Sequence, residues 1–111
     1  MSIWFNNYTV DDFITKDTMV EHLGIEVTQL GDDFVVGTMP VDKRTKQPFG
    51  ILHGGASVAL AETLASYAGF LTIDPEKYHI VGIEINANHL KMAKKGFVTG
   101  KCSPIKRGRS T

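Results

Sequence analysis

The sequence predicts an α+β domain in which an antiparallel sheet wraps around one long, buried central helix. Two observations carry this prediction. Residues 54–72 contain no proline and are apolar nearly all round, as in a helix enclosed by its own domain. Segments with strand patterns and turn signals flank this run, two before it and two after it. Because 111 residues provide one core, we expect a single domain over residues 1–111.

The part of the chain before the central helix is predicted to hold a short helix and a hairpin. Thr9 is a candidate N-cap followed by acids, and its helix is expected to end near His22. Residues 23–28 alternate apolar and polar side chains, which is strand periodicity. Residues 31–33 are a turn, and residues 34–39 are expected to return as the second strand.

A polar loop and the second half of the sheet are predicted around the helix. The loop covers residues 41–49 and contains Pro48 before Gly50. A turn is expected at 74–77, a strand at 80–90, a second strand at 97–103 and a basic loop from Pro104 onward.

Charge and cysteine content restrict the function classes. The formal net charge is zero, so nothing draws the whole molecule toward nucleic acid or membrane. Residues 91–109 nevertheless carry seven bases and no acid, which suits a polyanionic ligand or a solvated face. A single cysteine, Cys102, excludes an internal disulfide and fits a reducing compartment. The start of the chain lacks a signal-peptide pattern, so we expect a cytoplasmic protein.

Glu62 is the first candidate for a catalytic residue. It is the only charge in the predicted helix, where a membrane span would not tolerate it. Its helical neighbours Gly55, Ala59, Ser66 and Gly69 are small, so its carboxylate faces a space that side chains do not fill. A lone buried carboxylate is either functional or a structural glutamate held by backbone groups.

The residues before the helix suggest a site for developing negative charge. His53 precedes the paired glycines Gly54 and Gly55, whose N–H groups stay open to a ligand at a helix start. Such N–H groups can form an oxyanion hole, although paired glycines are more often plain loop chemistry. Gln47 lies in the preceding loop, and His89 lies on the apolar face of its strand, where a structural histidine is the commoner interpretation.

Other chemistries have little support in the sequence. The four histidines are widely separated and no metal-ligand spacing occurs, so no metal site is expected. There is no G-x-S-x-G nucleophile motif and no phosphate loop. Cys102 lacks a neighbouring base, which makes a thiol nucleophile improbable.

Two runs carry a family resemblance. Residues 44–62, RTKQPFGILHGGASVALAE, and residues 81–89, VGIEINANH, closely resemble the hot-dog-fold acyl-coenzyme A thioesterases of the 4-hydroxybenzoyl-CoA type. Within that family they look most like the bacterial branch that acts on 1,4-dihydroxy-2-naphthoyl-CoA and related thioesters. The H-G-G-A-S-x-x-x-A-E pattern is long and specific. The resemblance covers about residues 19–108 and implies hydrolysis of an acyl- or aroyl-CoA thioester.

The resemblance implies a role for each matching residue. Glu62 attacks the thioester carbonyl or activates the water that does so. The Gly54 N–H polarises the carbonyl oxygen. Gln47 and His53 orient the thioester, and Ser66 helps to place the attacking water.

The family pattern also implies how the substrate is held. His89 lines the acyl pocket and Gly55 borders the thioester. Lys106, Arg107 and Arg109 lie where the family meets the nucleotide of coenzyme A. Coenzyme A is part of the substrate, so no separate cofactor is expected.

The resemblance further implies a homodimer or homotetramer with active sites between subunits. The loop and helix start come from one chain and the carboxylate from its neighbour. The sequence departs from the family in one respect: members continue past the equivalent of Arg109 into further strands, so a truncated chain and an incomplete sheet are expected here. Two rivals remain, a non-catalytic subunit that binds acyl thioesters and a hot-dog hydratase or dehydratase. The latter carries its catalytic histidine well before the carboxylate, unlike His53 and Glu62.

Overall fold

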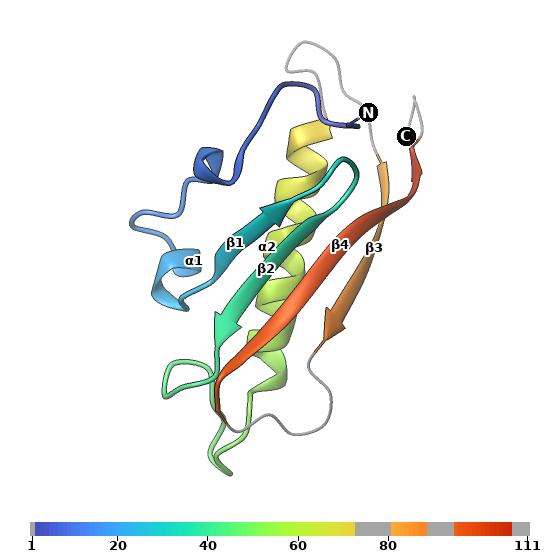
Figure 1. Cartoon of the computed structure of the whole chain (residues 1–111). Coiled ribbons are helices and arrows are strands. Elements are labelled where there is room, and N and C mark those ends of the chain that lie inside the picture. The colour runs from blue at the N-terminus through green and yellow to red at the C-terminus, as the bar shows by residue number, and fades with distance from the viewer. Residues whose placement is uncertain (1, 73–80, 89–94, 108–111) are drawn as a thin grey trace.

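The chain folds as one long helix against a four-stranded antiparallel sheet (Figure 1). This computed structural model describes residues 2–72, 81–88 and 95–107, with backbone alone for 81–88 and 104–107. The elements are η1 (Val10–Asp12), α1 (Met19–His22), β1 (Glu26–Leu30), β2 (Val35–Pro40), α2 (Gly54–Thr72), β3 (Val81–Asn88) and β4 (Phe97–Arg107). The sheet order is β1-β2-β4-β3, so the two hairpin pairs join where β2 meets β4. The predicted fold class is confirmed, and the sheet is open.

One side of α2 packs on the sheet to form the core. Leu60, Leu64 and Ala68 recur at intervals of four residues and are buried. They meet apolar side chains from β1, β2 and β4, among them Val35 and Met39, in a single hydrophobic cluster. Burial of this stripe fixes which side of the helix faces the sheet.

Two glycines let α2 approach the sheet closely. Gly37 of β2 and Gly100 of β4 are direct partners in the antiparallel register. A Cβ atom at Gly37 would lie 2.7 Å from Leu64 Cδ2, and one at Gly100 would lie 2.9 Å from Leu64 Cδ1. Leu64 therefore occupies the space that side chains at both positions would need, and it is fully buried.

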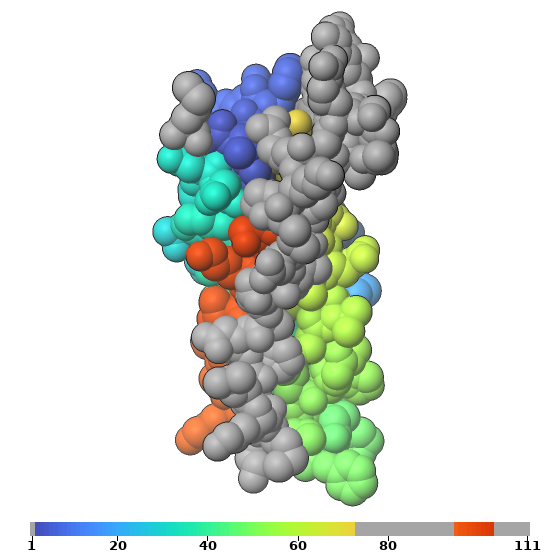
Figure 2. Space-filling view, turned by 90° about the vertical axis from the view of Figure 1, so that its right-hand side faces the viewer, coloured from blue at the N-terminus to red at the C-terminus, as the bar shows by residue number. Residues whose placement is uncertain are grey.

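The expectation that α2 is enclosed on all sides is wrong for the single chain. The side opposite the sheet is exposed, with Val58 and Phe70 accessible at 66% and 65%. Figure 2 shows this surface, coloured green to yellow, open beside the sheet. An open sheet of four strands covers one side of a helix only, so an apolar sequence does not by itself bury the other side.

The N-terminal segment forms two short helices instead of the one that was predicted. Thr9 caps η1 in a capping box with Asp12, as expected for an N-cap, but the chain is extended again at Phe13. Thr18 then caps α1 separately by accepting from Glu21 N–H. The second capping threonine starts a new helix because its side chain competes for backbone N–H groups that a continuous helix would use.

The last strand extends beyond its predicted end. Pro104 was expected to begin a loop, yet β4 continues to Arg107. Pro104 pairs with Ile83 where the register between β3 and β4 shifts. A bulge tolerates proline because the ladder hydrogen bond that proline cannot donate is already interrupted there.

The N-terminal segment ties the far end of α2 to the hairpin turn. Ile3 N–H donates to Asp32 O at 2.8 Å, and the Trp4 indole N–H donates to Gly31 O at 2.7 Å. Phe5 N–H donates to Leu71 O, also at 2.8 Å. The segment that follows, residues 6–14, therefore starts beside the C-terminal end of α2 (Figure 1).

Candidate active site

The loop between β2 and α2 is a closed turn that presents Gln47 and His53 at one end of the sheet. Lys46 and Leu52 form an antiparallel bridge across its base. Gln47 N–H donates to Ile51 O at 2.8 Å, and Gln47 O accepts from Gly50 N–H at 2.9 Å. The Gln47 side-chain oxygen accepts from Phe49 N–H, which leaves the amide NH₂ group as the part of this side chain available to a ligand.

Thr45, which was not among the predicted site residues, fixes this loop to the sheet. Its side chain is buried at 1% exposure, and its hydroxyl donates to Pro40 O at 2.7 Å. Its carbonyl oxygen accepts from His53 N–H at 2.7 Å. The loop is therefore attached to the end of β2 by hydrogen bonds, and Thr45 sets the position of His53.

The signal that could have revealed this anchor is the spacing of Asp42, Arg44 and Thr45. Asp42 accepts from both the backbone N–H and the guanidinium of Arg44, as an aspartate does at the start of a tight turn. The hydrogen bonds from the Arg44 side chain are the main reason that the pKa of Asp42 is lowered to about 2. The Arg44 guanidinium also donates to His22 O at 3.1 Å, which links α1 to the loop.

His53 is held against the start of α2. Gly55 N–H donates to His53 Nδ1 at 2.7 Å. Because Nδ1 accepts this bond, the neutral ring carries its proton on Nε2 and presents it as a donor. Gly55 is also the residue that makes room for the ring, since a Cβ atom there would lie 2.9 Å from both Cε1 and Nδ1 of His53.

This bond distinguishes the two glycines at the start of the helix from each other. The Gly55 N–H is occupied by His53, so within one chain it is not open to a ligand as the sequence suggested. The Gly54 N–H, in contrast, has no acceptor among the described residues, and nothing lies within 4 Å of the position that a Cβ atom on Gly54 would take. Gly54 is thus the better candidate for an oxyanion donor at the positive end of the α2 dipole.

Glu62 and Ser66 lie on the exposed side of α2, in line with Gly54. The expectation that Glu62 is buried is therefore wrong for the single chain. Its neighbours Gly55, Ala59 and Gly69 are small, as predicted, and leave the carboxylate in open space. Leu60 and Leu64 belong to the hydrophobic core, and Leu71 is buried as well. Tyr67 is partly buried against that core and also packs on Phe13 of the N-terminal segment.

The structure does not bring Glu62 and Gly54 of one chain together. They are eight residues apart on one straight helix, which is about 12 Å along its axis. Reacting atoms must approach to about 3–3.5 Å before a bond forms. A carbonyl beside Glu62 is therefore beyond the reach of the Gly54 N–H of the same chain.

The basic residues of β4 also lie away from the loop. Lys106 and Arg107 are at the end of β4 beside the C-terminal end of α2, whereas Gln47 and His53 are at the opposite end (Figure 1). The side chains of Lys106 and Arg107 are outside the description. His89 and Arg109 also lie outside the described residues.

The described residues offer no support for a thiol nucleophile or a metal site. Burial raises the pKa of the Cys102 thiol to about 11, so the thiol is protonated near neutral pH. Among residues 2–72, 81–88 and 95–107, no group of three His, Cys, Asp or Glu side chains could hold a metal ion. No helix in that part of the chain is long and apolar enough to cross a membrane.

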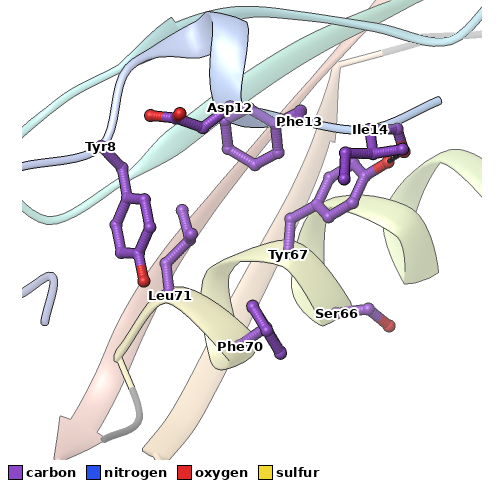
Figure 3. Close-up of a pocket in the computed structure, with 8 residues that line it drawn as sticks. All are labelled: Tyr8, Asp12, Phe13, Ile14, Ser66, Tyr67, Phe70 and Leu71. Carbon is purple, nitrogen blue, oxygen red and sulfur yellow. Dashed lines mark hydrogen bonds between the residues drawn. The ribbon is translucent and has the colours of Figure 1, made fainter. Parts of the chain in front are cut away.

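An apolar pocket of about 380 Å³ lies between residues 8–14 and the last two turns of α2 (Figure 3). Four aromatic side chains line it, from Tyr8, Phe13, Tyr67 and Phe70. The rings of Phe13 and Tyr67 meet edge to face, with centroids 4.7 Å apart. The Tyr67 hydroxyl donates to Ile14 O at 3.1 Å, which pins the N-terminal segment over the helix.

The pocket was not predicted, because residues 9–22 were expected to form one helix. The signal that could have revealed it is the pair of aromatic residues Tyr8 and Phe13 on either side of the predicted helix start. Ser66 lies at the edge of the pocket nearer to Glu62, one helical turn away from the carboxylate.

Comparisons with known proteins show the family to which this fold belongs. Residues 49–111 match the thioesterase superfamily. A proofreading thioesterase, EntH, from Cronobacter turicensis is 51% identical over 111 residues, which is 98% of this chain and 80% of the relative. A putative esterase from Haemophilus influenzae is 47% identical over 110 residues, which is 97% of this chain and 79% of the relative.

A solved structure supports the same conclusion. The crystal structure of a thioesterase from Haemophilus influenzae superposes with a TM-score of 0.82 at 48% identity, covering 96% of this chain and 76% of that one. The fold and these relatives therefore define a hot-dog-fold thioester hydrolase, and the chain belongs to the thioesterase superfamily. The narrower resemblance to the 1,4-dihydroxy-2-naphthoyl-CoA branch has no support from these relatives.

Proposed function

We propose that this chain hydrolyses an acyl- or aroyl-coenzyme A thioester, with Glu62 as the catalytic carboxylate. The observation that carries the proposal is the exposed carboxylate of Glu62 on a helix face that begins with the open N–H of Gly54. A carboxylate in a space bordered by small side chains leaves room for a reacting carbonyl beside it. A helix N-terminus favours the negative charge that develops on the carbonyl oxygen.

Two routes lead from this arrangement to the same products. As a general base, Glu62 takes a proton from water, whose oxygen then bonds to the carbonyl carbon. As a nucleophile, its own oxygen bonds to that carbon and water later releases the acyl group. In both, the C–S bond breaks and coenzyme A leaves as a thiol once its sulfur is protonated. Ser66, one turn from Glu62, is suited to position the water.

His53 and Gln47 are assigned to orient the thioester. The Nε2–H of His53 and the amide NH₂ of Gln47 are both donors, and both come from the loop that Thr45 anchors. Two donors presented by one anchored loop suit the carbonyl oxygen of a thioester or an amide oxygen of the pantetheine arm.

The complete site is proposed to form between two copies of the chain. Gly54, Val58 and Glu62 follow one another at intervals of four residues, so they share one face of α2. Antiparallel pairing of two α2 helices about Val58 brings Glu62 of one copy beside Gly54 of the partner subunit. The same pairing brings the basic end of β4 toward the start of α2 in the other copy. There, Lys106 and Arg107 are suited to bind the anionic nucleotide of coenzyme A.

The test is hydrolysis by the purified chain of benzoyl-CoA and of hexanoyl-CoA, with the released thiol trapped by a chromogenic disulfide. Glu62→Ala is expected to reduce thiol release by about a hundredfold or more, or about 2.7 kcal/mol of barrier. The substitution lies on an exposed helix surface, so circular dichroism should show an unchanged fold. A folded wild-type chain that releases no thiol from either substrate would refute the enzyme proposal and favour a thioester-binding subunit.

A further inference from the structure

We propose that Thr45 is a positioning residue for thioester hydrolysis, and that its buried hydroxyl holds His53 in the place where His53 meets the substrate. This inference rests on the proposed function, because it takes His53 as a residue that orients the thioester. The Thr45 side chain is 1% exposed, so it does not touch a substrate itself. Its effect on the reaction therefore passes through the loop that carries His53.

The first argument is the peptide group to which the Thr45 hydroxyl is bonded. The hydroxyl donates to Pro40 O at 2.7 Å, and Pro40 is the last residue of β2. The N–H of the same peptide group belongs to Val41 and donates to Gly96 O at 2.8 Å, directly before β4. A peptide group is planar, so hydrogen bonds at both its polar atoms fix its orientation. Thr45 is therefore anchored to a point that β2 and the start of β4 hold together.

The second argument is that each polar group of Thr45 has a partner. Its hydroxyl oxygen accepts from Asp42 N–H at 3.0 Å, and its own N–H donates to Asp42 O at 2.9 Å. Its carbonyl oxygen accepts from His53 N–H at 2.7 Å. Three bonds thus lead back to residues 40–42 and one leads forward to His53. At 1% exposure water does not compete for these bonds, so they hold the geometry firmly.

The third argument concerns the way in which His53 is held. Thr45 O fixes its main chain, and the bond from Gly55 N–H to Nδ1, at 2.7 Å, fixes its ring. Together the two bonds define where the Nε2–H of His53 lies and in which direction it points. The His53 side chain is exposed, so packing in the core does not keep it there. Its position depends on these hydrogen bonds, and the Thr45 hydroxyl is the side-chain group that connects them to the sheet.

The experiment removes this hydroxyl with Thr45→Val, which keeps the shape of the side chain. Residue 45 can then move away from β2 and take His53 with it. A misplacement of about 1 Å by a change away from the reacting atoms can cost about a hundredfold in rate. For benzoyl-CoA we expect kcat to fall about tenfold or more and KM to change less than about twofold, since the nucleotide is assigned to Lys106 and Arg107. The ¹⁵N shifts of His53, measured by NMR, should change as well.

Thr72→Val is the matched control for a merely structural role. Thr72 is 5% exposed, and its hydroxyl donates to Gly69 O at 2.8 Å at the other end of α2. The substitution removes a buried, hydrogen-bonded hydroxyl of the same kind, so the thermal midpoint should fall to a similar extent. Both kcat and the His53 shifts should nevertheless stay as in the wild type. Thr45→Ser retains the hydroxyl and should keep kcat within about twofold of the wild type.

Several results would overturn the inference. They are a folded Thr45→Val that keeps the wild-type kcat or the wild-type His53 shifts, a Thr72→Val that loses as much kcat, and a Thr45→Ser that loses as much as the valine. If Thr45→Val does not fold, Thr45→Ser decides together with amide hydrogen exchange of the wild type. A His53 amide that exchanges without protection then overturns the inference, because the bond to Thr45 O predicts slow exchange.

Failure of this inference can be told apart from failure of the proposed function. A wild-type chain that hydrolyses neither thioester refutes the proposed function, while the His53 shifts still report whether the Thr45 hydroxyl holds the loop. A hydrolase in which Thr45→Val is fully active refutes only the role of Thr45.

Discussion

His53 and Gly55 form the tightest local arrangement in the candidate site. The Gly55 N–H donates to Nδ1 and thereby sets both the orientation and the tautomer of the ring. The same glycine lacks the Cβ atom that would collide with the imidazole. One residue type therefore meets two requirements at this position, whereas at Gly54 the surrounding space is open and no side chain is excluded by contact.

Gly55→Ala is expected to displace the His53 ring and break the N–H to Nδ1 hydrogen bond. The new methyl group would lie 2.9 Å from the ring, closer than carbon atoms approach without a shift. We expect kcat/KM to fall about tenfold or more. A tenfold loss corresponds to about 1.4 kcal/mol, which is about the net free energy of one hydrogen bond. The ¹⁵N shifts of His53, measured by NMR, report the change of tautomer or environment directly.

Gly54→Ala provides the matched control for that prediction. It adds the same methyl group to the neighbouring residue, where nothing lies within 4 Å. The His53 ¹⁵N shifts should stay as in the wild type, and the thermal midpoint should not fall because alanine favours a helix over glycine. Equal His53 shifts in both variants would contradict the role given to Gly55.

The sequence identified candidate site residues more readily than it predicted the burial and contacts of those residues. The run ending in Glu62 identified Gln47, His53, Gly54 and Glu62 as candidates, and the structure brings the loop and helix start together. Burial of Glu62 was predicted wrongly, because a sequence that is apolar all round does not say which side of the helix the chain itself covers. Thr45 was missed because its role depends on tertiary hydrogen bonds to Pro40 and His53.

At the scale of elements, α2 and the sheet fit each other through three residues. Gly37 and Gly100 are partners on β2 and β4, and the Leu64 side chain packs on the sheet at these two positions. Because both positions lack a side chain, α2 can approach the sheet more closely. The contact with Leu64 therefore sets the distance between the sheet and the part of α2 that carries Glu62, two residues before Leu64.

Gly100→Ala is therefore expected to destabilise the fold by about 1–3 kcal/mol, the range found when a well-packed core is overfilled. The added Cβ atom would lie 2.9 Å from Leu64 Cδ1, and both sides of the contact are buried. Urea unfolding of the wild type and variant measures the difference. In a Leu64→Val background, which removes the Cδ atoms, Gly100→Ala should cost less free energy of unfolding. An equal cost in both backgrounds would show that the contact with Leu64 is not the cause.

The boundaries of helices and strands were predicted correctly only where the local sequence pattern was strong. The bounds of α2 agree with the predicted helix at 54–72, since a long run without proline leaves little ambiguity. The N-terminal helix and the end of β4 were predicted wrongly, because a second capping threonine at Thr18 and a strand bulge at Pro104 both depend on pairing that periodicity does not reveal.

At the scale of the whole molecule, the candidate functional groups are divided between opposite ends of one chain. The loop with Gln47 and His53 lies at one end of the sheet, and the basic end of β4 and the aromatic pocket lie at the other. Between them runs the exposed face of α2 with Val58 near its first turns. Two chains that pair antiparallel along this face bring the opposite ends together, which a single chain cannot do.

Val58→Asp tests this pairing. Val58 is 66% exposed in the single chain, so an aspartate there leaves the core untouched and circular dichroism should not change. At a twofold axis the two new carboxylates would face each other, and juxtaposed like charges at an interface cost several kcal/mol. We expect light scattering after size-exclusion chromatography to give a smaller mass than for the wild type. Thiol release should fall about a hundredfold or more, as for loss of the carboxylate itself.

Phe97→Asp is the control for the Val58 prediction, since it places the same charge on a residue of similar exposure away from α2. It should retain both the mass and the activity of the wild type. A Val58→Asp chain with unchanged mass and full activity would contradict pairing about Val58. A smaller mass with full activity would mean instead that one chain holds a complete site, and the roughly 12 Å between Gly54 and Glu62 would then require an oxyanion donor other than Gly54.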